Sequence, residues 1–344
     1  MINWKKCGIA SLTTVSMLAV TACGGSTSTA PENSNSSSAA SEQKTVKLQI
    51  ASVYSDLSAP AKGTQMFADL VKERSNGSIQ VDFFPNGSLG SEREIFEGVS
   101  SGDLQMVLGG TQGVDMYASE YMFITAPFLF SNMDHLKKVM ASDLGKKMFE
   151  KMDESNVHIL GINYRGARHM TSTKPVKTPE DLSGLKLRLP ELEAWVAAWK
   201  ELGALPTPIA LPELYGALQT GVVDASEGPY EQMATFKLQE VQKYVINTAH
   251  IYEPTFLWIN KGLWDSLSKE QQELLQQAAD EAMEFADKEA VTDAEKFYKE
   301  LQDAGMEVID PDLDKFIEKA QPALKQFFET KWNVTNLEEI NSYK

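Results

Sequence analysis

Arg188 is the residue of this chain whose type and position best suit a binding site. It lies near the end of the run Gly184-Leu185-Lys186-Leu187-Arg188-Leu189-Pro190, in which leucines alternate with two cations. Strands of parallel sheets are normally apolar on both faces, and ligands of open α/β sheets bind at the carboxyl ends of the strands. A guanidinium matches a carboxylate with two parallel hydrogen bonds. The run therefore predicts a carboxylate site at Arg188, with a structural ion pair as the alternative.

The composition of the chain argues against several other kinds of site. Its 344 residues include 48 acidic and 32 basic side chains, a net charge of −16, so an extended contact with nucleic acid is not expected. Four histidines and two cysteines supply no zinc cluster of the usual spacing, and the sequence has no HExxH, P-loop or GxGxxG motif. We therefore expect no cofactor, no metal and no nucleic-acid partner.

Residues 1–22 have the composition of an export signal. A basic start precedes an apolar stretch from Gly8 to Val20 that is too short to span a bilayer stably, and small residues lead to Cys23. The segment resembles a bacterial lipoprotein signal, in which Cys23 becomes the lipidated N-terminus. A secretory signal followed by a stray cysteine is the alternative. Residues 23–43, rich in Ser, Thr and Asn, predict a flexible tether.

From residue 44 onward, strand and helix signals alternate along the chain. Apolar patterns predict strands at 46–50, 79–83, 104–108, 157–162, 185–189 and 222–225. Helical patterns lie between several of them, and Ser91 and Gly102 are expected to bound one such helix. This alternation predicts an α/β fold with mainly parallel sheets and helices on both faces.

A much longer helix is predicted towards the end of the chain. Ser268 begins a capping box with Gln271, and helical periodicity then continues to about Asp303, with Gly305 as the stop signal. About 35 residues of helix are about 50 Å long, which exceeds one small domain. We therefore expect this helix to cross between two domains.

Several runs of the sequence carry a family resemblance. They are PNGSLGSER at 85–93, RHMTS at 168–172, KPVKTPEDL at 174–182, GLKLRLP at 184–190, PTP at 206–208, ELYGALQTGVVD at 213–224 and EGP at 227–229. In this order they resemble the solute receptors of tripartite ATP-independent periplasmic (TRAP) transporters. The resemblance covers essentially everything after the tether.

The resemblance implies a two-lobed periplasmic-binding-protein-like clamshell with hinge strands. Lobe I is expected at 44–165 and 254–293, and lobe II at 166–253 and 294–344. The family's carboxylate-binding arginine falls on Arg188 and a second ligand-contacting arginine on Arg168, for which an ion pair with a carboxylate such as Asp181 is the alternative. The implied partners are the small and large permease subunits. We expect a monomer, anchored outside the bacterial cell membrane through Cys23.

Three pocket positions depart from the sialic-acid branch of that family. Gly228 stands where the branch has an asparagine, Leu211 where it has an aromatic residue, and Gly110 where it has an acidic residue. The loss of a large ring and of two polar groups predicts an acid other than sialic acid.

Four further residues are candidates for ligand contact. Glu92 lies in the first turn of a helix, where the helix dipole alone favours a carboxylate. Glu227 is predicted to follow a strand and to contact the ligand or to buttress Arg188. Trp195 is a candidate for the pocket wall or for the core, and Tyr54 lies just past the first strand.

These observations predict a receptor, not an enzyme. We expect it to capture a small carboxylate and to deliver it to a TRAP-type permease for uptake driven by an ion gradient. An anchored extracellular enzyme would need a nucleophile and a base in the cleft, and the sequence has no GxSxG motif. A receptor that feeds a sensor kinase stays open, as do C4-dicarboxylates, sugar acids and keto acids as ligands.

Overall fold

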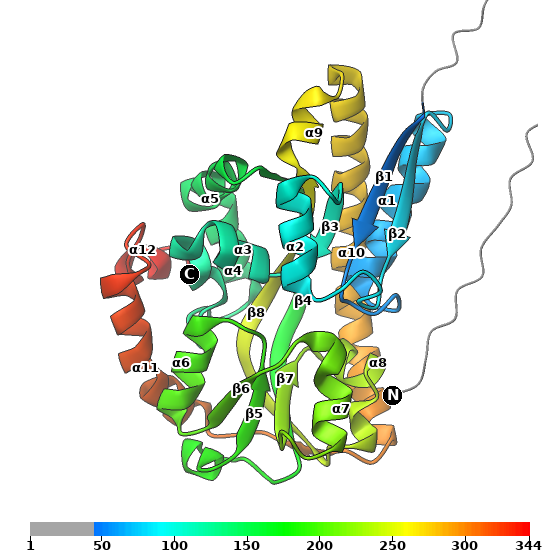
Figure 1. Cartoon of the computed structure of the whole chain (residues 1–344). Coiled ribbons are helices and arrows are strands. Elements are labelled where there is room, and N and C mark those ends of the chain that lie inside the picture. Colours follow the sequence, from blue (N-terminus) through cyan, green and yellow to red (C-terminus); the bar gives the residue numbers. More distant parts are fainter. Residues whose placement is uncertain (1–44) are drawn as a thin grey trace, which may run out of the picture. The chain divides into compact units, whose positions relative to one another are not determined.

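The structure is a computed structural model that describes residues 45–344 (Figure 1). The predicted signal peptide, Cys23 and the tether lie outside the described residues. The described part falls within one compact unit.

The described chain alternates strands and helices from its start. The strands are β1 (Val46–Ala51), β2 (Ile79–Phe84), β3 (Met106–Gly109), β4 (Val157–Ser172), β5 (Lys186–Leu189), β6 (Leu205–Pro208), β7 (Ala225–Gly228), β8 (Tyr244–Asn260) and β9 (Glu307–Ile309). The α-helices are α1 (Ala59–Arg74), α2 (Glu92–Ser101), α3 (Gln112–Tyr117), α4 (Met133–Ala141), α5 (Asp143–Glu154), α6 (Glu193–Leu202), α7 (Leu214–Gln219), α8 (Tyr230–Thr235), α9 (Lys261–Ser266), α10 (Lys269–Asp303), α11 (Leu313–Thr330) and α12 (Leu337–Asn341). Short 3₁₀ turns are η1 (Ser119–Thr125), η2 (Pro179–Leu182), η3 (Leu211–Glu213) and η4 (Leu238–Glu240).

The strands form one mixed sheet in the order β2-β1-β3-β8-β4-β7-β5-β6, with β9 on β8. The parallel pairings that the alternation predicts occur in two groups, β2-β1-β3 and β7-β5-β6. Between these groups, β8 pairs antiparallel with β3 and β4, and β4 pairs antiparallel with β7. The α/β prediction is therefore confirmed, and the sheet is mixed because two long strands join its parallel groups.

Strands β4 and β8 run between the two groups of strands (Figure 1). The expected lobe boundaries at 165/166 and 253/254 fall inside these strands, where the register sets Tyr164 opposite Pro254 and Gly166 opposite Glu253. The ladder shifts register between Tyr164 and Gly166, and Gly166 has a φ of +110°. Only glycine adopts such a backbone readily, so the sequence places a local irregularity in β4 at this point.

Helix α10 lies against α1, β4 and α8. Half of its buried residues are alanines, with Ala278, Ala282 and Ala286 among them. A Cβ atom on Gly63 would lie 2.8 Å from the carbonyl oxygen of Ala282, and one on Gly161 would lie 2.7 Å from Met283 Cγ. Small residues on both sides therefore let α10 approach its neighbours closely. No helix of the described residues is both long and apolar enough to cross a membrane.

Predictions that depend on local sequence agree with the structure. Ser91 and Ser268 form complete capping boxes at the starts of α2 and α10, and Gly102 ends α2 in the left-handed conformation. Two strand predictions were wrong in extent. The strand predicted at 157–162 continues to Ser172, because its pairing with β8 continues to that residue. The strand predicted at 222–225 is β7 at 225–228, because its pairing with β4 and β5 starts at Ala225.

Candidate functional site

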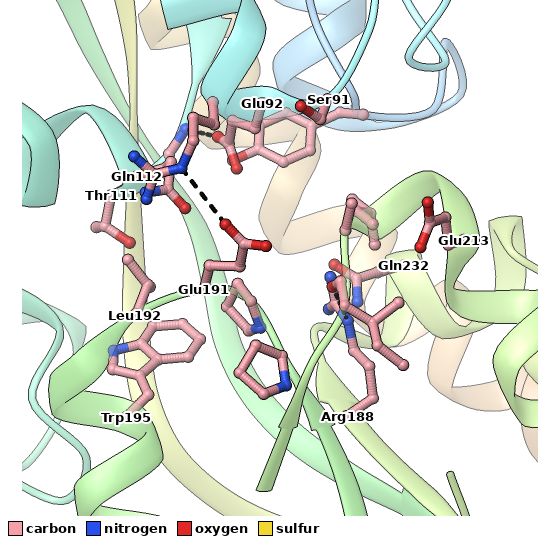
Figure 2. Close-up of a pocket in the computed structure, with 18 of the residues that line it drawn as sticks. Ser91, Glu92, Thr111, Gln112, Arg188, Glu191, Leu192, Trp195, Glu213 and Gln232 are labelled. Carbon is pink, nitrogen blue, oxygen red and sulfur yellow. Dashed lines mark hydrogen bonds and ion pairs between the residues drawn. The ribbon is translucent and has the colours of Figure 1, made fainter. Parts of the chain in front are cut away.

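A cavity of about 460 Å³ lies among the ends of β1, β3 and β5 and the middle of β4 and β8 (Figure 2). Charged and polar residues on its walls include Tyr54, Glu92, Thr111, Gln112, Arg165, Arg168, Arg188, Gln232 and Glu253. In Figure 2, Glu92 and Gln112 lie on one side of the cavity and Arg188 and Trp195 on the other. The predicted carboxyl-end location of the site agrees with this position.

Arg188 lies on β5, and only 2% of its surface is exposed. Its Nε donates to the carbonyl oxygen of Ile209 at 2.8 Å, and no carboxylate of the described residues lies within salt-bridge distance of it. Burial lowers the pKa of the Arg188 guanidinium to about 10, so it stays a cation at neutral pH. A buried cation without an acid partner is unfavourable unless something else supplies the negative charge.

Arg168 also lines the cavity, but two glutamates already pair with it. Its Nε donates to Glu227 Oε2 at 2.6 Å, its Nη2 to Glu227 Oε1 at 2.8 Å and its Nη1 to Glu253 Oε2 at 2.6 Å. Burial alone would lower the pKa of Arg168, but Glu227 and Glu253 raise it above its ordinary value. The predicted alternative partner, Asp181, instead accepts backbone N–H groups of Lys177 and Thr178 at 2.8 and 3.0 Å.

Arg165 is a third buried arginine of the cavity that sequence reasoning missed. Its Nη2 and Nε donate to Glu231 Oε2 at 2.9 and 3.2 Å, and its Nη1 lies 3.6 Å from Glu253 Oε2. The guanidinium lies 4.2 Å from the centre of the Tyr54 ring. Arg165 was overlooked because its strand was expected to end at Ile162.

Tyr54, Glu92 and Gly110 meet at one end of the cavity. Glu92 Oε1 accepts the Gly110 N–H at 2.7 Å. Burial raises the pKa of Glu92, although the Gly110 N–H lowers it. A Cβ atom on Gly110 would lie 2.5 Å from the Tyr54 hydroxyl oxygen and 3.6 Å from a carboxylate oxygen of both Glu92 and Glu253. Because residue 110 is a glycine, this space is left to the side chains of Tyr54, Glu92 and Glu253.

Trp195 and Gln112 line opposite sides of the cavity (Figure 2). Trp195 is 1% exposed and Gln112 is 5% exposed, and neither the indole Nε1 nor the amide Nε2 has a hydrogen-bond partner among the described residues. The Trp195 ring lies 4.9 Å from the Arg168 guanidinium carbon. Trp199, one turn further along α6, is buried in the core against His250.

Glu227 and Gly228 lie on β7 and do not line the cavity directly. Burial alone would raise the pKa of Glu227, but Arg168 and His250 lower it to about 2. Glu227 therefore buttresses Arg168, whereas the sequence predicted either ligand contact or a buttress for Arg188, with which Glu227 forms no ion pair. A Cβ atom on Gly228 would lie 2.4 Å from Gln232 Nε2, so the Gln232 amide occupies the space that a side chain at 228 would take.

The mouth of the cavity is closed in part by contacts between distant segments. Arg93 Nε lies 3.4 Å from Glu191 Oε2, and a Cβ atom on Gly87 would lie 2.8 Å from Pro212 Cγ. Leu211, which stands where the sialic-acid branch of the family has an aromatic residue, lines the cavity wall.

The described lining residues include no histidine, so the cavity has the groups to bind and orient an anion but no imidazole to act as a base.

Comparison with known proteins shows which family this chain belongs to. The model of the bacterial extracellular solute-binding protein family 7 matches residues 50–331. The 2,3-diketo-L-gulonate-binding periplasmic protein of Escherichia coli is 34% identical over 72% of this chain and 76% of its own. The C4-dicarboxylate-binding periplasmic protein of Rhodobacter capsulatus is 31% identical over 71% of this chain and 74% of its own.

A solved structure has the same fold. A TRAP periplasmic solute-binding protein from Polaromonas sp. JS666, bound to D-erythronate, has 30% identity and a TM-score of 0.81, and the match covers 87% of this chain and 98% of that one.

The fold and the family to which the matching proteins belong define a solute-binding receptor of a transporter and not an enzyme. The chain belongs to the bacterial extracellular solute-binding protein family 7, the solute receptors of TRAP transporters. It is an extracytoplasmic receptor that binds a small organic acid and delivers it to a TRAP permease for uptake.

Proposed function

We propose that Arg188 binds the carboxylate of the transported acid. The observation that carries the proposal is a buried guanidinium that faces the cavity and has no acid partner among the described residues. A ligand carboxylate supplies the missing charge, and the planar fork of the guanidinium gives it two parallel hydrogen bonds. Arg168 and Arg165 are less available to a ligand carboxylate, because glutamates already pair with them.

The receptor closes around its ligand by a movement of two lobes. Lobe I comprises 44–165 and 254–293, and lobe II comprises 166–253 and 294–344. The bulge and the positive φ at Gly166 support a hinge in β4, directly opposite Glu253 of β8. Contacts at the mouth between Arg93 and Glu191 and between Gly87 and Pro212 are suited to stabilising the closed form.

The receptor works as a monomer, held at the outer face of the cell membrane by lipid on Cys23. The sequence before Cys23 supports the anchor.

Calorimetry on the full chain tests the role of Arg188. D-Erythronate, which the Polaromonas protein binds, is the first probe, followed by a panel of organic acids. Removing one partner of a buried charge pair typically costs about 2 to 5 kcal/mol, so Arg188→Ala should weaken binding by about 30- to 5,000-fold. Arg188→Lys should recover little of this loss.

Lys186→Ala is the matched control, because Lys186 is a cation on the same strand, does not line the cavity and has a partly exposed side chain. Binding of wild-type strength by a folded Arg188→Ala protein would refute the proposal.

A further inference from the structure

Building on the carboxylate role proposed for Arg188, we infer that the ligand is a hydroxylated monocarboxylate and that the cavity rejects a second carboxylate. The inference depends on how the charges around the cavity are already paired and on where the unpaired acceptors lie.

Every other arginine on the described walls of the cavity has an acid partner. Arg165 pairs with Glu231, Arg168 with Glu227 and Glu253, and Arg93 at the mouth with Glu191. A dicarboxylate needs a second cation that is free to accept its second charge. Among the described lining residues, Arg188 alone meets that requirement, so one carboxylate exhausts the available positive charge.

The far end of the cavity is anionic. Glu92 and Glu253 each place a carboxylate oxygen 3.6 Å from the same point, the position that a Cβ atom on Gly110 would take. Glu92 has no cation within salt-bridge distance among the described residues, and one of its oxygens accepts the Gly110 N–H. Figure 2 shows Glu92 on the side of the cavity away from Arg188. A ligand carboxylate anchored on Arg188 would therefore direct its other end at the unpaired carboxylate of Glu92 and at Glu253 Oε1, the oxygen of Glu253 that takes no part in its ion pairs.

Hydroxyl groups fit this end of the cavity and carboxylates do not. A hydroxyl donates one hydrogen bond and accepts others. It can donate to Glu92 or to Glu253 Oε1, and the Gln112 side chain lies on the same side of the cavity as Glu92 (Figure 2). A second carboxylate accepts only, so it cannot satisfy the glutamates and meets like charge, which costs several kcal/mol at a desolvated contact.

Matched pairs of acids test the inference on the full chain. Erythronate and tartrate differ by one terminal CH₂OH or carboxylate, and so do gluconate and glucarate. We expect the monocarboxylate of at least one pair to bind about 100-fold or more tightly than its dicarboxylate partner, since like-charge contacts cost several kcal/mol. Calorimetry at fixed pH and ionic strength measures both members of each pair.

Glu92→Gln provides the mechanistic arm of the experiment. It removes the negative charge, keeps the size and breaks no ion pair, so the preference for the monocarboxylate should fall about tenfold or more. Glu97→Gln on the same helix is the control, because Glu97 is exposed and lies outside the cavity, and it should leave the preference unchanged.

The outcomes separate this inference from the role of Arg188. Dicarboxylates that bind as tightly as their partners, with binding still lost in Arg188→Ala, would overturn the inference and leave the carboxylate site standing. An unchanged preference in Glu92→Gln, or no binding by any hydroxylated monocarboxylate of the panel, would also overturn it. Normal binding by Arg188→Ala would refute the carboxylate site itself.

Discussion

Arg168 and Glu227 meet in two parallel hydrogen bonds, Nε to Oε2 at 2.6 Å and Nη2 to Oε1 at 2.8 Å. His250 Nε2 lies 3.3 Å from Glu227 Oε2, and His250 Nδ1 lies 2.7 Å from the Thr248 hydroxyl oxygen. All four side chains are buried. Arg168 is thus the paired arginine of the cavity and Arg188 the unpaired one, and the two should respond differently to substitution.

Arg168→Ala should destabilise the ligand-free protein by about 3 to 5 kcal/mol, because it leaves Glu227 and Glu253 as buried charges without their cation. Arg188→Ala removes a cation that has no acid partner, and its stability without ligand should stay within about 1 kcal/mol of wild type. Urea denaturation at pH 7 measures both. Equal losses in the two variants would contradict the division of roles.

Sequence reasoning found the features that depend on neighbouring residues. The capping boxes at Ser91 and Ser268 follow from residues three apart, and the motif around Arg188 located the cavity. The predicted extents of β4 and β7 were wrong because the ends of a strand depend on its pairing with distant strands. The β4 ladder continues on β8 well past Ile162, which brings Arg165 into the cavity.

The charge pairing around the cavity was beyond sequence reasoning for the same physical reason. Glu253 lies 85 residues from Arg168, and only the antiparallel register of β4 and β8 brings the two together. The contact between Gln232 and Gly228 is closer in sequence, but it depends on where β7 ends and α8 begins. Arg188 was identified because a cation in an apolar strand is unusual by itself.

The space between Gly110 and Tyr54 gives a second prediction. Gly110→Ala should destabilise the protein by about 1 to 3 kcal/mol and weaken ligand binding, because the new methyl group would lie 2.5 Å from the Tyr54 hydroxyl oxygen. Adding Tyr54→Phe removes that oxygen and should recover most of the stability. Gly216→Ala is the control, since nothing lies within 4 Å of its Cβ position. Strictly additive effects in thermal or urea unfolding would show that the two residues do not compete for space.

The buried histidines predict a loss of stability on mild acidification. Burial, with a smaller contribution from His250, lowers the pKa of His169 to about 3, and burial also lowers the pKa of His250. Below about pH 6.5 the unfolded chain binds protons that the folded chain does not, so stability is present above pH 6.5 and falls as the pH drops towards 3. Each histidine contributes a slope of up to about 1.4 kcal/mol per pH unit.

His169→Gln keeps an acceptor for the Ala249 N–H and should reduce the slope of unfolding free energy between pH 7 and 5. Urea unfolding at several pH values measures the slope. A variant with the wild-type slope would show that His169 protonates equally in the folded and unfolded states.

The lipid anchor is tested at Cys23, which lies outside the described residues. Cys23→Ala removes the sulfur that would carry the lipid, so the protein should appear in the soluble fraction or keep its signal peptide. Membrane fractionation and mass spectrometry of the N-terminus distinguish these forms. Wild-type protein that is wholly soluble and has an unmodified N-terminus elsewhere would contradict the anchor.

Ligand-driven closure should be visible by small-angle scattering. If the two lobes rotate about β4 and β8, a saturating acid ligand should reduce the radius of gyration of the wild-type protein, because the closed form is more compact. Arg188→Ala should show no reduction at the same ligand concentration, since it lacks the carboxylate site. A ligand shifts such an equilibrium only by its differential affinity for the two forms, so the change should follow the binding isotherm. A profile that stays the same while calorimetry shows full occupancy would refute closure and leave binding intact.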